Sequence, residues 1–424
     1  MTRILQIFRH KKTLGTIDRF LNSAAPITVA LMFSKILTRE QFGLYSLAMS
    51  LFMTLAFFES FFQTATIRYC ATKNPERFTE VVSSLLYWKL AALVVAWLLV
   101  LLVGVPVARL YKQEALLAIF RWFPIMFLAF TLESHFVSII RAKQDIQELV
   151  RQDAIFAAAY VGLSLLLVRR VHTAEQMFIV YLVAFLPNLI YLTARFPEFL
   201  KISHGMFRPV AAEIFHYGKY TALVGLGALA YQNFDVMMIG YLRSIEDVGV
   251  YRLGRIAANL VVIVTQGILL TLMPQISTLH EEGRHTQIKA VYDRHVRLLL
   301  QVFIPFFLLS LAFAGPLFDW YFAGKYRGAE IIFSIFAFTG IIKAFENPQG
   351  ALLAGVGLIH LDSVQMWASV AVNIILNLLL IPRWGFIGAA LATNVTLLSG
   401  ALLKQHFIRK HYYAKVGTYS VASA

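Results

Sequence analysis

Long apolar segments recur along the chain and are separated by short polar stretches. The segment 90–103 is apolar without interruption, and 298–313 is nearly so. A membrane-spanning helix needs roughly 20 mostly apolar residues, and about twelve segments of that length can be placed. Their approximate limits are 15–35, 44–66, 83–104, 117–140, 152–168, 175–194, 215–241, 250–274, 296–317, 330–353, 362–381 and 386–407. The connections between them are too short to hold a separate catalytic domain.

The composition agrees with this pattern. Hydrophobic residues make up 59% of the chain and charged residues only 14%, whereas a soluble globular domain carries about 25% charged residues. The mean hydropathy is +0.68. A soluble core cannot hide this much apolar surface, because larger soluble proteins divide into domains with charged exteriors. The sequence therefore predicts an all-α polytopic membrane protein.

The net charge of +15 is distributed unevenly between the two sides of the predicted spans. Lys and Arg outside the spans are about twice as frequent on the side of the N-terminus, which the positive-inside rule places in the cytoplasm. An even number of spans then places the C-terminus there too. Because topology accounts for much of the basicity, we expect no nucleic-acid partner. The basic stretch 1–12 precedes an apolar stretch that continues to Leu37, so we expect an uncleaved first span.

One short motif occurs twice. The stretch 42–48 recurs as 248–254, and each copy follows a glutamate (Glu40, Glu246) at the same distance. The repeat predicts two six-helix lobes related by a parallel pseudo-two-fold axis. We expect an N-terminal lobe over 1–196, a cytoplasmic linker over 197–213 and a C-terminal lobe with a cytoplasmic tail over 214–424. The repeated Gly and Tyr residues are interpreted as packing and interface anchors rather than as substrate contacts.

Polar residues at membrane depth are functional candidates where the two lobes differ. Arg252, Arg255 and Asn259 share one face of the eighth span, and the first lobe has Ser46, Met49 and Met53 at the matching positions. A charge at the bilayer centre costs about 2.5–3.5 kcal/mol even on the lenient insertion scale. Such side chains therefore tend to face a cavity or a partner. Two alternatives stay open: Arg252 could reach the outer interface, and Arg255 could pair with Asp235.

Further charged residues fall within the predicted spans. Arg19 lies near the cytoplasmic end of the first span, and Lys343 lies in the middle of the tenth, one turn from Glu346. Lys89 lies near a cytoplasmic end, where snorkelling of its ammonium group is the simpler explanation. A membrane-buried carboxylate can take a proton or hold a sodium ion. The candidates for ion coupling are Glu59, Glu133, Asp235 and Glu346.

Several chemistries have no motif in this sequence. There is no P-loop, and His280 and His285 are spaced by five residues rather than by the four of a zinc-binding helix. There is also no Gly-x-Ser-x-Gly nucleophile elbow. The lone Cys70 excludes an internal disulfide framework and a multi-cysteine metal site. We therefore expect no enzyme activity, no cofactor and no metal.

Five motifs spread along nearly the whole chain are the stretches 37–45, 235–240, 246–251, 322–326 and 381–393. Together they resemble motifs of the bacterial polysaccharide (O-antigen or exopolysaccharide) flippases, the Wzx-type branch of the multidrug/oligosaccharidyl-lipid/polysaccharide exporter superfamily. The resemblance implies two lobes around a central cavity in the bacterial cytoplasmic (inner) membrane. It also implies a polyprenyl-pyrophosphate-linked oligosaccharide that crosses from the inner to the outer leaflet by alternating access.

The resemblance gives the intramembrane residues a role. Arginine can bind phosphate oxygens bidentately, so a pyrophosphate carrier suits the basic candidates. The predicted substrate-binding residues are Arg19, Arg252, Arg255, Asn259 and Lys343. Without an ATP site, a proton or sodium gradient or the membrane potential would drive the cycle. The partners implied are membrane lipids, the coupling ion and other polysaccharide assembly proteins.

Three other functions compete with this interpretation. A drug or metabolite exporter of the same superfamily commonly takes cations, so acidic residues should dominate its cavity. A membrane enzyme of the sugar pathway, such as a polymerase or ligase, should carry a long outer loop with polar residues. A scaffold or receptor without transport would leave the charges of the second lobe unexplained.

Overall fold

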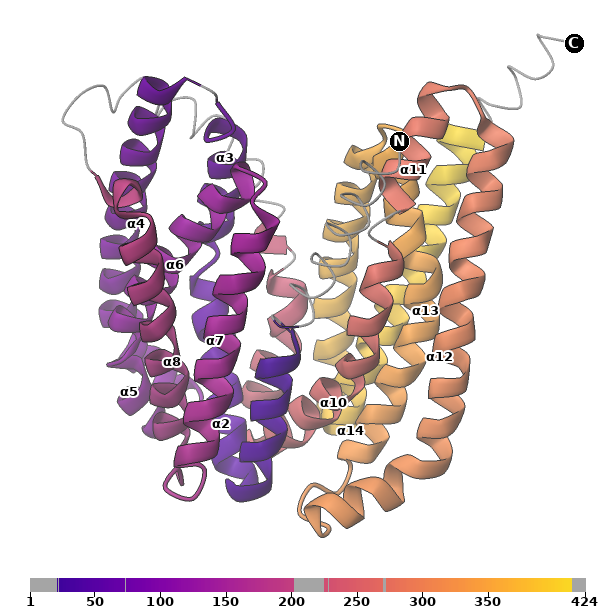
Figure 1. Ribbon diagram of the computed structural model, residues 1–424. Coiled ribbons are helices and arrows are strands. Elements are labelled where there is room, and N and C mark those ends of the chain that lie inside the picture. The colour runs from indigo at the N-terminus through magenta and orange to yellow at the C-terminus, as the bar shows by residue number, and fades with distance from the viewer. Residues whose placement is uncertain are drawn as a thin grey trace, which may run out of the picture. The chain divides into compact units, whose positions relative to one another are not determined.

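The computed structural model describes residues 21, 23–72, 74–201, 225–227, 229–269 and 272–413. Helices dominate these ranges, and no strand occurs among the described residues. The chain divides into two compact units, Met1–Tyr241 and Leu242–Ala424. Figure 1 colours the first from indigo to magenta and the second from rose to yellow. The predicted all-α class is confirmed.

The first unit is a bundle in which most helices are long and apolar. Its helices are Ser23–Ile36, α2 (Arg39–Leu55), α3 (Phe58–Tyr69), α4 (Pro75–Leu110), α5 (Ala115–Phe120), α6 (Phe123–Ala142), α7 (Ile146–Leu167), α8 (Ala174–Arg195), the 3₁₀ turn η1 (Pro197–Leu200) and a helix over 229–242. Four aromatic rings from α2, α6 and α8 pack together in its core, with Phe52 stacked on Phe127 and Phe123 stacked on Phe178.

Local sequence signals set several of these helix starts. The Thr38 hydroxyl accepts a hydrogen bond of 3.1 Å from the backbone N–H of Gln41 and caps α2. Asn74 caps α4 in the same way, immediately before Pro75. Thr173 and Gln176 form a reciprocal capping box at α8. Each cap satisfies backbone donors that a helix start leaves without partners.

The span predicted over 44–66 is not one straight helix. Helix α2 ends at Leu55, α3 begins at Phe58, and the two are bent by 50°. The backbone N–H of Phe57 bonds to the carbonyl of Thr54 rather than to that of Met53, so the regular helical pattern is interrupted here. Breaks of this kind within membrane helices are tolerated where neighbouring groups satisfy the freed backbone. The bend places Glu59 in the first turn of α3.

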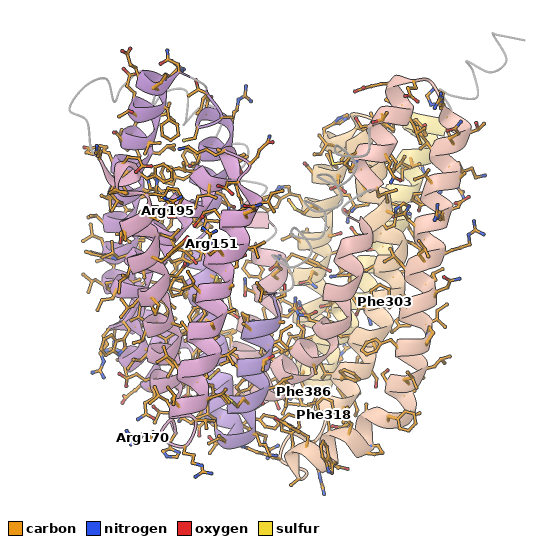
Figure 2. The ribbon with its side chains drawn as sticks, viewed as in Figure 1. Arg151, Arg170, Arg195, Phe303, Phe318 and Phe386 are labelled. Atoms are coloured by element: carbon orange, nitrogen blue, oxygen red, sulfur yellow. The ribbon has the colours of Figure 1, made fainter. Side chains whose placement is uncertain are left out.

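The second unit contains the remaining helices. They are α10 (Ile245–Leu269), α11 (Leu272–Glu281), α12 (His285–Phe322), α13 (Ala329–Gly355), α14 (Ile359–Ile408) and a π-helical turn η2 (Arg409–Tyr413). Helix α14 is broken at Gly385, whose φ of 57° is readily adopted by glycine. This break matches the boundary predicted between the spans 362–381 and 386–407. Phe303 of α12, labelled in Figure 2, packs against Gly340 of α13.

Within the described residues, six helices are long and apolar enough to cross a membrane, or seven if α2 and α3 form one span. The two halves of broken α14 count here as one. The polytopic membrane class is thus supported, whereas the count of twelve spans and the parallel two-fold relation stay predictions.

The lobe boundary also stays a prediction. The repeat places it at 197–213, most of which lies outside the described residues. The contacts group residues 229–241, all but the last residue of the helix over 229–242, with the first unit. In that unit Thr54 Oγ1 lies 3.8 Å from Met237 Sδ, and Gly240 lies against Leu47 and Tyr111.

The repeated motif is a packing element in both units. Tyr45 is 9% exposed and Tyr251 is fully buried, and the ring of Tyr251 meets that of Phe336 edge-on at 5.7 Å. Gly43 and Gly249 are buried as well. The interpretation of these residues as structural is supported, although they lie in the interior rather than at an exposed interface.

Cys70 provides a direct check on the packing at the end of α3. Its side chain is 2% exposed, and burial raises the pKa of its thiol to about 12. Because the thiolate is the reactive form, we expect negligible alkylation of the native protein by N-ethylmaleimide at pH 8. Complete alkylation should follow in denaturing detergent, as measured by intact mass. Rapid labelling of the native protein would show that this end of α3 opens.

Candidate functional site

A polar cavity of about 400 Å³ lies inside the first unit. Helices α3, α6 and α7 supply most of its walls, and residues 225 and 229 complete it. Its polar lining residues are Glu59, Ser60, Gln63, Glu133, Ser134, Arg141, Gln152 and Asp153. A polar cavity among helices of membrane-spanning length is costly unless it is hydrated or filled, so it marks a functional site by default.

The lining residue Glu59 pairs with a buried lysine. Lys89 Nζ lies 2.9 Å from Glu59 Oε2, and the Ser134 hydroxyl donates to the same oxygen at 2.7 Å. Lys89 is fully buried and Glu59 is 5% exposed. The expectation that Lys89 snorkels is therefore wrong, because its ammonium group has an internal partner. The other carboxylate oxygen, Glu59 Oε1, is buried and makes no hydrogen bond within the described part of the chain.

A chain of hydrogen bonds through Asn188 joins three lining residues, Glu133, Gln152 and Asp153. The Asn188 amide donates both to Glu133 Oε1 at 3.1 Å and to Gln152 Oε1 at 3.0 Å. The Gln152 amide in turn donates to Asp153 Oδ1. Asn188 is fully buried, and its Oδ1 has no partner among the described residues. Glu133 is thus held at the cavity by a neutral amide.

Two further side-chain contacts stabilise the helices next to the cavity. Arg151 of α7, labelled in Figure 2, pairs with Glu148 at 2.7 Å and donates to the Tyr191 hydroxyl at 3.2 Å. Next to Ser134, the ring nitrogen Nε2 of His135 lies 2.9 Å from the Phe199 carbonyl. The start of the predicted linker is therefore anchored on the first unit at η1.

The basic candidates of the second unit lie on two packed helices. Arg252 and Arg255 of α10 and Lys343 of α13 are half-buried, whereas Asn259 is exposed. The Arg255 guanidinium carbon lies 5.5 Å from the ring centroid of Phe336. Phe336 is two helical turns before Lys343 on α13, and the charge of Arg255 also acts on Lys343. Two of the predicted substrate-binding cations, Arg255 and Lys343, thus lie on packed helices of one unit.

Glu346, which lies one turn from Lys343, pairs with a different lysine. Lys404 of α14 pairs with Glu346 and lies 2.8 Å from Asp362 Oδ1. Lys404 is 5% exposed, so this cluster ties α13 to both ends of α14. Within the described residues Lys343 forms no ion pair. A cavity role for Lys343 stays a prediction.

The remaining predicted residues do not join these groups. Arg19 lies outside the described residues. Asp235 is fully buried on the helix over 229–242 of the first unit, so its pairing with Arg255 of the second unit stays a hypothesis. Of the four ion-coupling candidates, only Glu59 and Glu133 line the cavity.

Sequence reasoning missed five polar partners: Ser134, Asn188, Gln152, Asp153 and Lys404. Their common signal was a polar side chain inside an apolar helix. Buried polar groups are almost always hydrogen-bonded, so such residues can be expected to pair across helices. The sequence does not show which ones pair.

Gly254 tests the packing that positions Arg255. A Cβ atom at residue 254 would lie 2.5 Å from the Ala329 carbonyl oxygen and 2.7 Å from Ile332 Cβ. Gly254→Ala should therefore force α10 away from α13 at a cost of about 1–3 kcal/mol, which a thermal melt in detergent measures. Gly162→Ala is the matched control, since nothing lies within 4 Å of its Cβ position. Equal melting temperatures for the two variants would contradict the close approach.

The sequence matches one protein-family model and is similar to proteins named as flippases. The model of the polysaccharide biosynthesis protein family matches residues 32–331. A probable low-salt glycan biosynthesis flippase, Agl15 of Haloferax volcanii, is 25% identical over 295 residues, which are 68% of this chain and 61% of the relative. The probable flippase AglR of the same organism is 23% identical over 46% of this chain and 42% of its own length. The chain thus covers less than two thirds of the length of these relatives.

Solved transporters share the fold at low sequence identity. An inward-facing multidrug resistance MATE family transporter of the MOP superfamily aligns with a TM-score of 0.77 at 12% identity, covering 96% of each chain. The lipid II flippase MurJ aligns with a TM-score of 0.69 at 12% identity, covering 94% of this chain and 87% of its own. With the family match over residues 32–331, the chain belongs to the polysaccharide biosynthesis protein family and has the fold of the MOP superfamily.

Proposed function

We propose that this protein moves a polyprenyl-pyrophosphate-linked oligosaccharide from the inner to the outer leaflet of the cytoplasmic membrane by alternating access. The distribution of Lys and Arg supports a topology with both termini in the cytoplasm. The relatives of the family that are named as flippases support the activity. The proposed partners are the lipid-linked glycan, membrane lipids and other polysaccharide assembly proteins.

The observation that carries the proposal is the group of half-buried cations in the second unit. Arg255 and Lys343 come from the packed helices α10 and α13, and Lys343 has no ion-pair partner among the described residues. Keeping such charges at membrane depth is expensive unless an anion or water meets them. A pyrophosphate supplies concentrated negative charge and several acceptor oxygens, which arginine binds in a fork geometry. Arg252, Asn259 and Arg19 are proposed as further contacts.

We place ion coupling in the first unit. Glu133 is the strongest candidate because its one hydrogen-bond partner among the described residues is the neutral amide of Asn188. Glu59 and Glu346 already hold lysines. Asp235 is buried outside the cavity. A proton or sodium ion at Glu133 would therefore change the charge of the cavity without breaking a lysine pair.

Reconstitution tests the proposal. The purified protein is placed in vesicles with a fluorescent polyprenyl-pyrophosphate oligosaccharide, and a membrane-impermeant quencher reports which leaflet holds the glycan. We expect transfer that requires the protein and slows with Glu133→Gln. Vesicles containing the protein that move this lipid no faster than empty vesicles would refute the function.

A second function has one specific observation in its favour. The cavity of the first unit carries Glu59, Glu133 and Asp153, and acidic cavities suit cationic drugs. An ion-coupled exporter of cationic molecules predicts resistance to ethidium in cells that produce the protein. The flippase predicts no such resistance, so a growth assay on ethidium separates the two.

A further inference from the structure

We propose that the cavity of the first unit is a sugar subsite, which takes hydroxyl- or amine-bearing sugars that lack a carboxylate. The phosphate contact proposed above lies in the second unit, so the glycan part of the substrate has no contact assigned to it. The inference rests on the proposed function, since it concerns the glycan part of the same substrate. It specifies which chemical class of sugar the cavity binds.

The first argument is the direction of the hydrogen bonds around the cavity. The Asn188 amide donates hydrogen bonds to Glu133 and to Gln152, and the Gln152 amide donates one to Asp153. The Ser134 hydroxyl and Lys89 both donate to Glu59. The donors at the site are therefore largely engaged by the protein itself.

One acceptor of a lining residue, in contrast, has no partner. Glu59 Oε1 is buried and makes no hydrogen bond with the described residues. A buried acceptor without a partner costs about 1–3 kcal/mol, so a native site of this kind is expected to receive donors from a ligand or water. Sugar hydroxyls and amines are such donors.

The second argument is size. The volume of about 400 Å³ falls within the roughly 300–1,000 Å³ of small-molecule sites. A water molecule occupies about 30 Å³ of liquid, and cation sites hold their oxygen ligands within about 2.6 Å of the ion. The cavity is therefore too large for a bare cation and suits a ligand of one or two sugar rings.

The third argument is the mixture of surfaces. Met53, Phe130, Val137 and Leu229 form an apolar part of the lining beside the polar groups. A pyranose ring has the same two characters, because its C–H groups form apolar faces and its hydroxyls lie around the edge. Apolar walls with a few placed polar groups are typical of small-molecule sites.

The fourth argument is charge. Glu133 and Asp153 add negative charge to the cavity, while Lys89 offsets Glu59. Arg141 is the one basic side chain among the described lining residues, and it is exposed in the last turn of α6. A carboxylate on the bound sugar would meet the acidic groups at short range, where like charges repel. Uronic acids are therefore excluded from this subsite.

Site-directed labelling tests the subsite in the purified full-length protein. Gln63→Cys places a thiol in the lining, and Cys70→Ala removes the native one. The measurement is the rate of labelling by a small neutral methanethiosulfonate reagent. We expect N,N′-diacetylchitobiose to slow labelling about tenfold at roughly ten times its Kd. Digalacturonic acid at the same concentration should leave the rate unchanged.

Controls make the result specific. Glu114→Cys, exposed in the connection between α4 and α5, should label at the same rate with and without sugar. Adding Glu133→Gln to the Gln63→Cys protein replaces an acceptor oxygen with a donor and should weaken protection. Glu175→Gln, at the start of α8 beside Arg121 and Trp122, should not weaken it.

Three results would overturn the subsite. They are protection by digalacturonic acid equal to that by the neutral disaccharide, protection by sodium chloride but not by the sugar, and protection by tetraphenylphosphonium but not by the sugar. The second indicates an ion site alone, and the third a site for cationic drugs. Vesicle transfer of the lipid-linked glycan without sugar protection would reject only the subsite. Protection without transfer would reject only the transport function.

Discussion

Arg255→Ala should abolish polysaccharide export in cells that depend on this protein, while its abundance in the membrane stays unchanged. The reason is that Arg255 is proposed to hold the pyrophosphate through charge-assisted hydrogen bonds in a site of low dielectric. Removing one partner of such a contact costs about 2–5 kcal/mol. That range corresponds to a loss of roughly 30-fold to several thousandfold in binding. Surface polysaccharide and protein abundance are measured together.

Companion variants separate the phosphate contact from packing. Arg255→Lys keeps the charge but loses the fork geometry, so export should fall partly. Arg294→Ala changes an exposed arginine of α12 and should leave export intact. Normal export by the Arg255→Ala protein would exclude the phosphate contact. If Arg255→Ala and Asp235→Ala both lower abundance, the ion pair between them becomes the better account.

Lys89→Met should destabilise the first unit more than any surface change. Lys89 is fully buried against Glu59, so its loss leaves a buried carboxylate without its counter-charge. Breaking a buried pair in this way costs about 3–5 kcal/mol. For a unit of this size the loss corresponds to a fall in Tm of roughly 6–20 °C. Thermal unfolding in detergent, followed by tryptophan fluorescence, measures it.

The double variant provides the control for this prediction. Lys89→Met with Glu59→Gln removes both charges, and replacing a whole buried pair is often neutral. We therefore expect the double variant to melt close to the native protein and well above Lys89→Met. A double variant that melts as low as Lys89→Met would mean that packing of the lysine stem, not charge pairing, stabilises the bundle.

Hydropathy predicted the helices because an apolar segment that spans a membrane must satisfy its backbone hydrogen bonds internally, and a helix does so. The break at Gly385 was foreseeable as well, since Pro382 and Gly385 interrupt the apolar run between two predicted spans. The bend between α2 and α3 was not. Apolar residues continue through Ala56 and Phe57, so the sequence carries no proline or glycine there to mark it.

Hydropathy could not predict which polar residues pair with each other. Lys89 lies near a helix end in the sequence, where snorkelling is the natural expectation, yet it turns inward to Glu59. Lys343 lies one turn from Glu346 on α13, and Lys404 lies on α14. Only Lys404 forms an ion pair with Glu346. Which partner is chosen depends on how each helix is rotated about its axis. That rotation is decided by packing among helices distant in sequence.

The pair of Glu59 and Lys89 also bears on how the protein is made. The two residues are 30 positions apart, and the glutamate is synthesised first. At about 5–20 residues per second, Lys89 follows roughly two to six seconds later. During that interval α3 can enter the bilayer only with a protonated Glu59 or while the insertion machinery keeps it hydrated. The lysine then completes the pair, so α3 and α4 are expected to leave that machinery together as a hairpin.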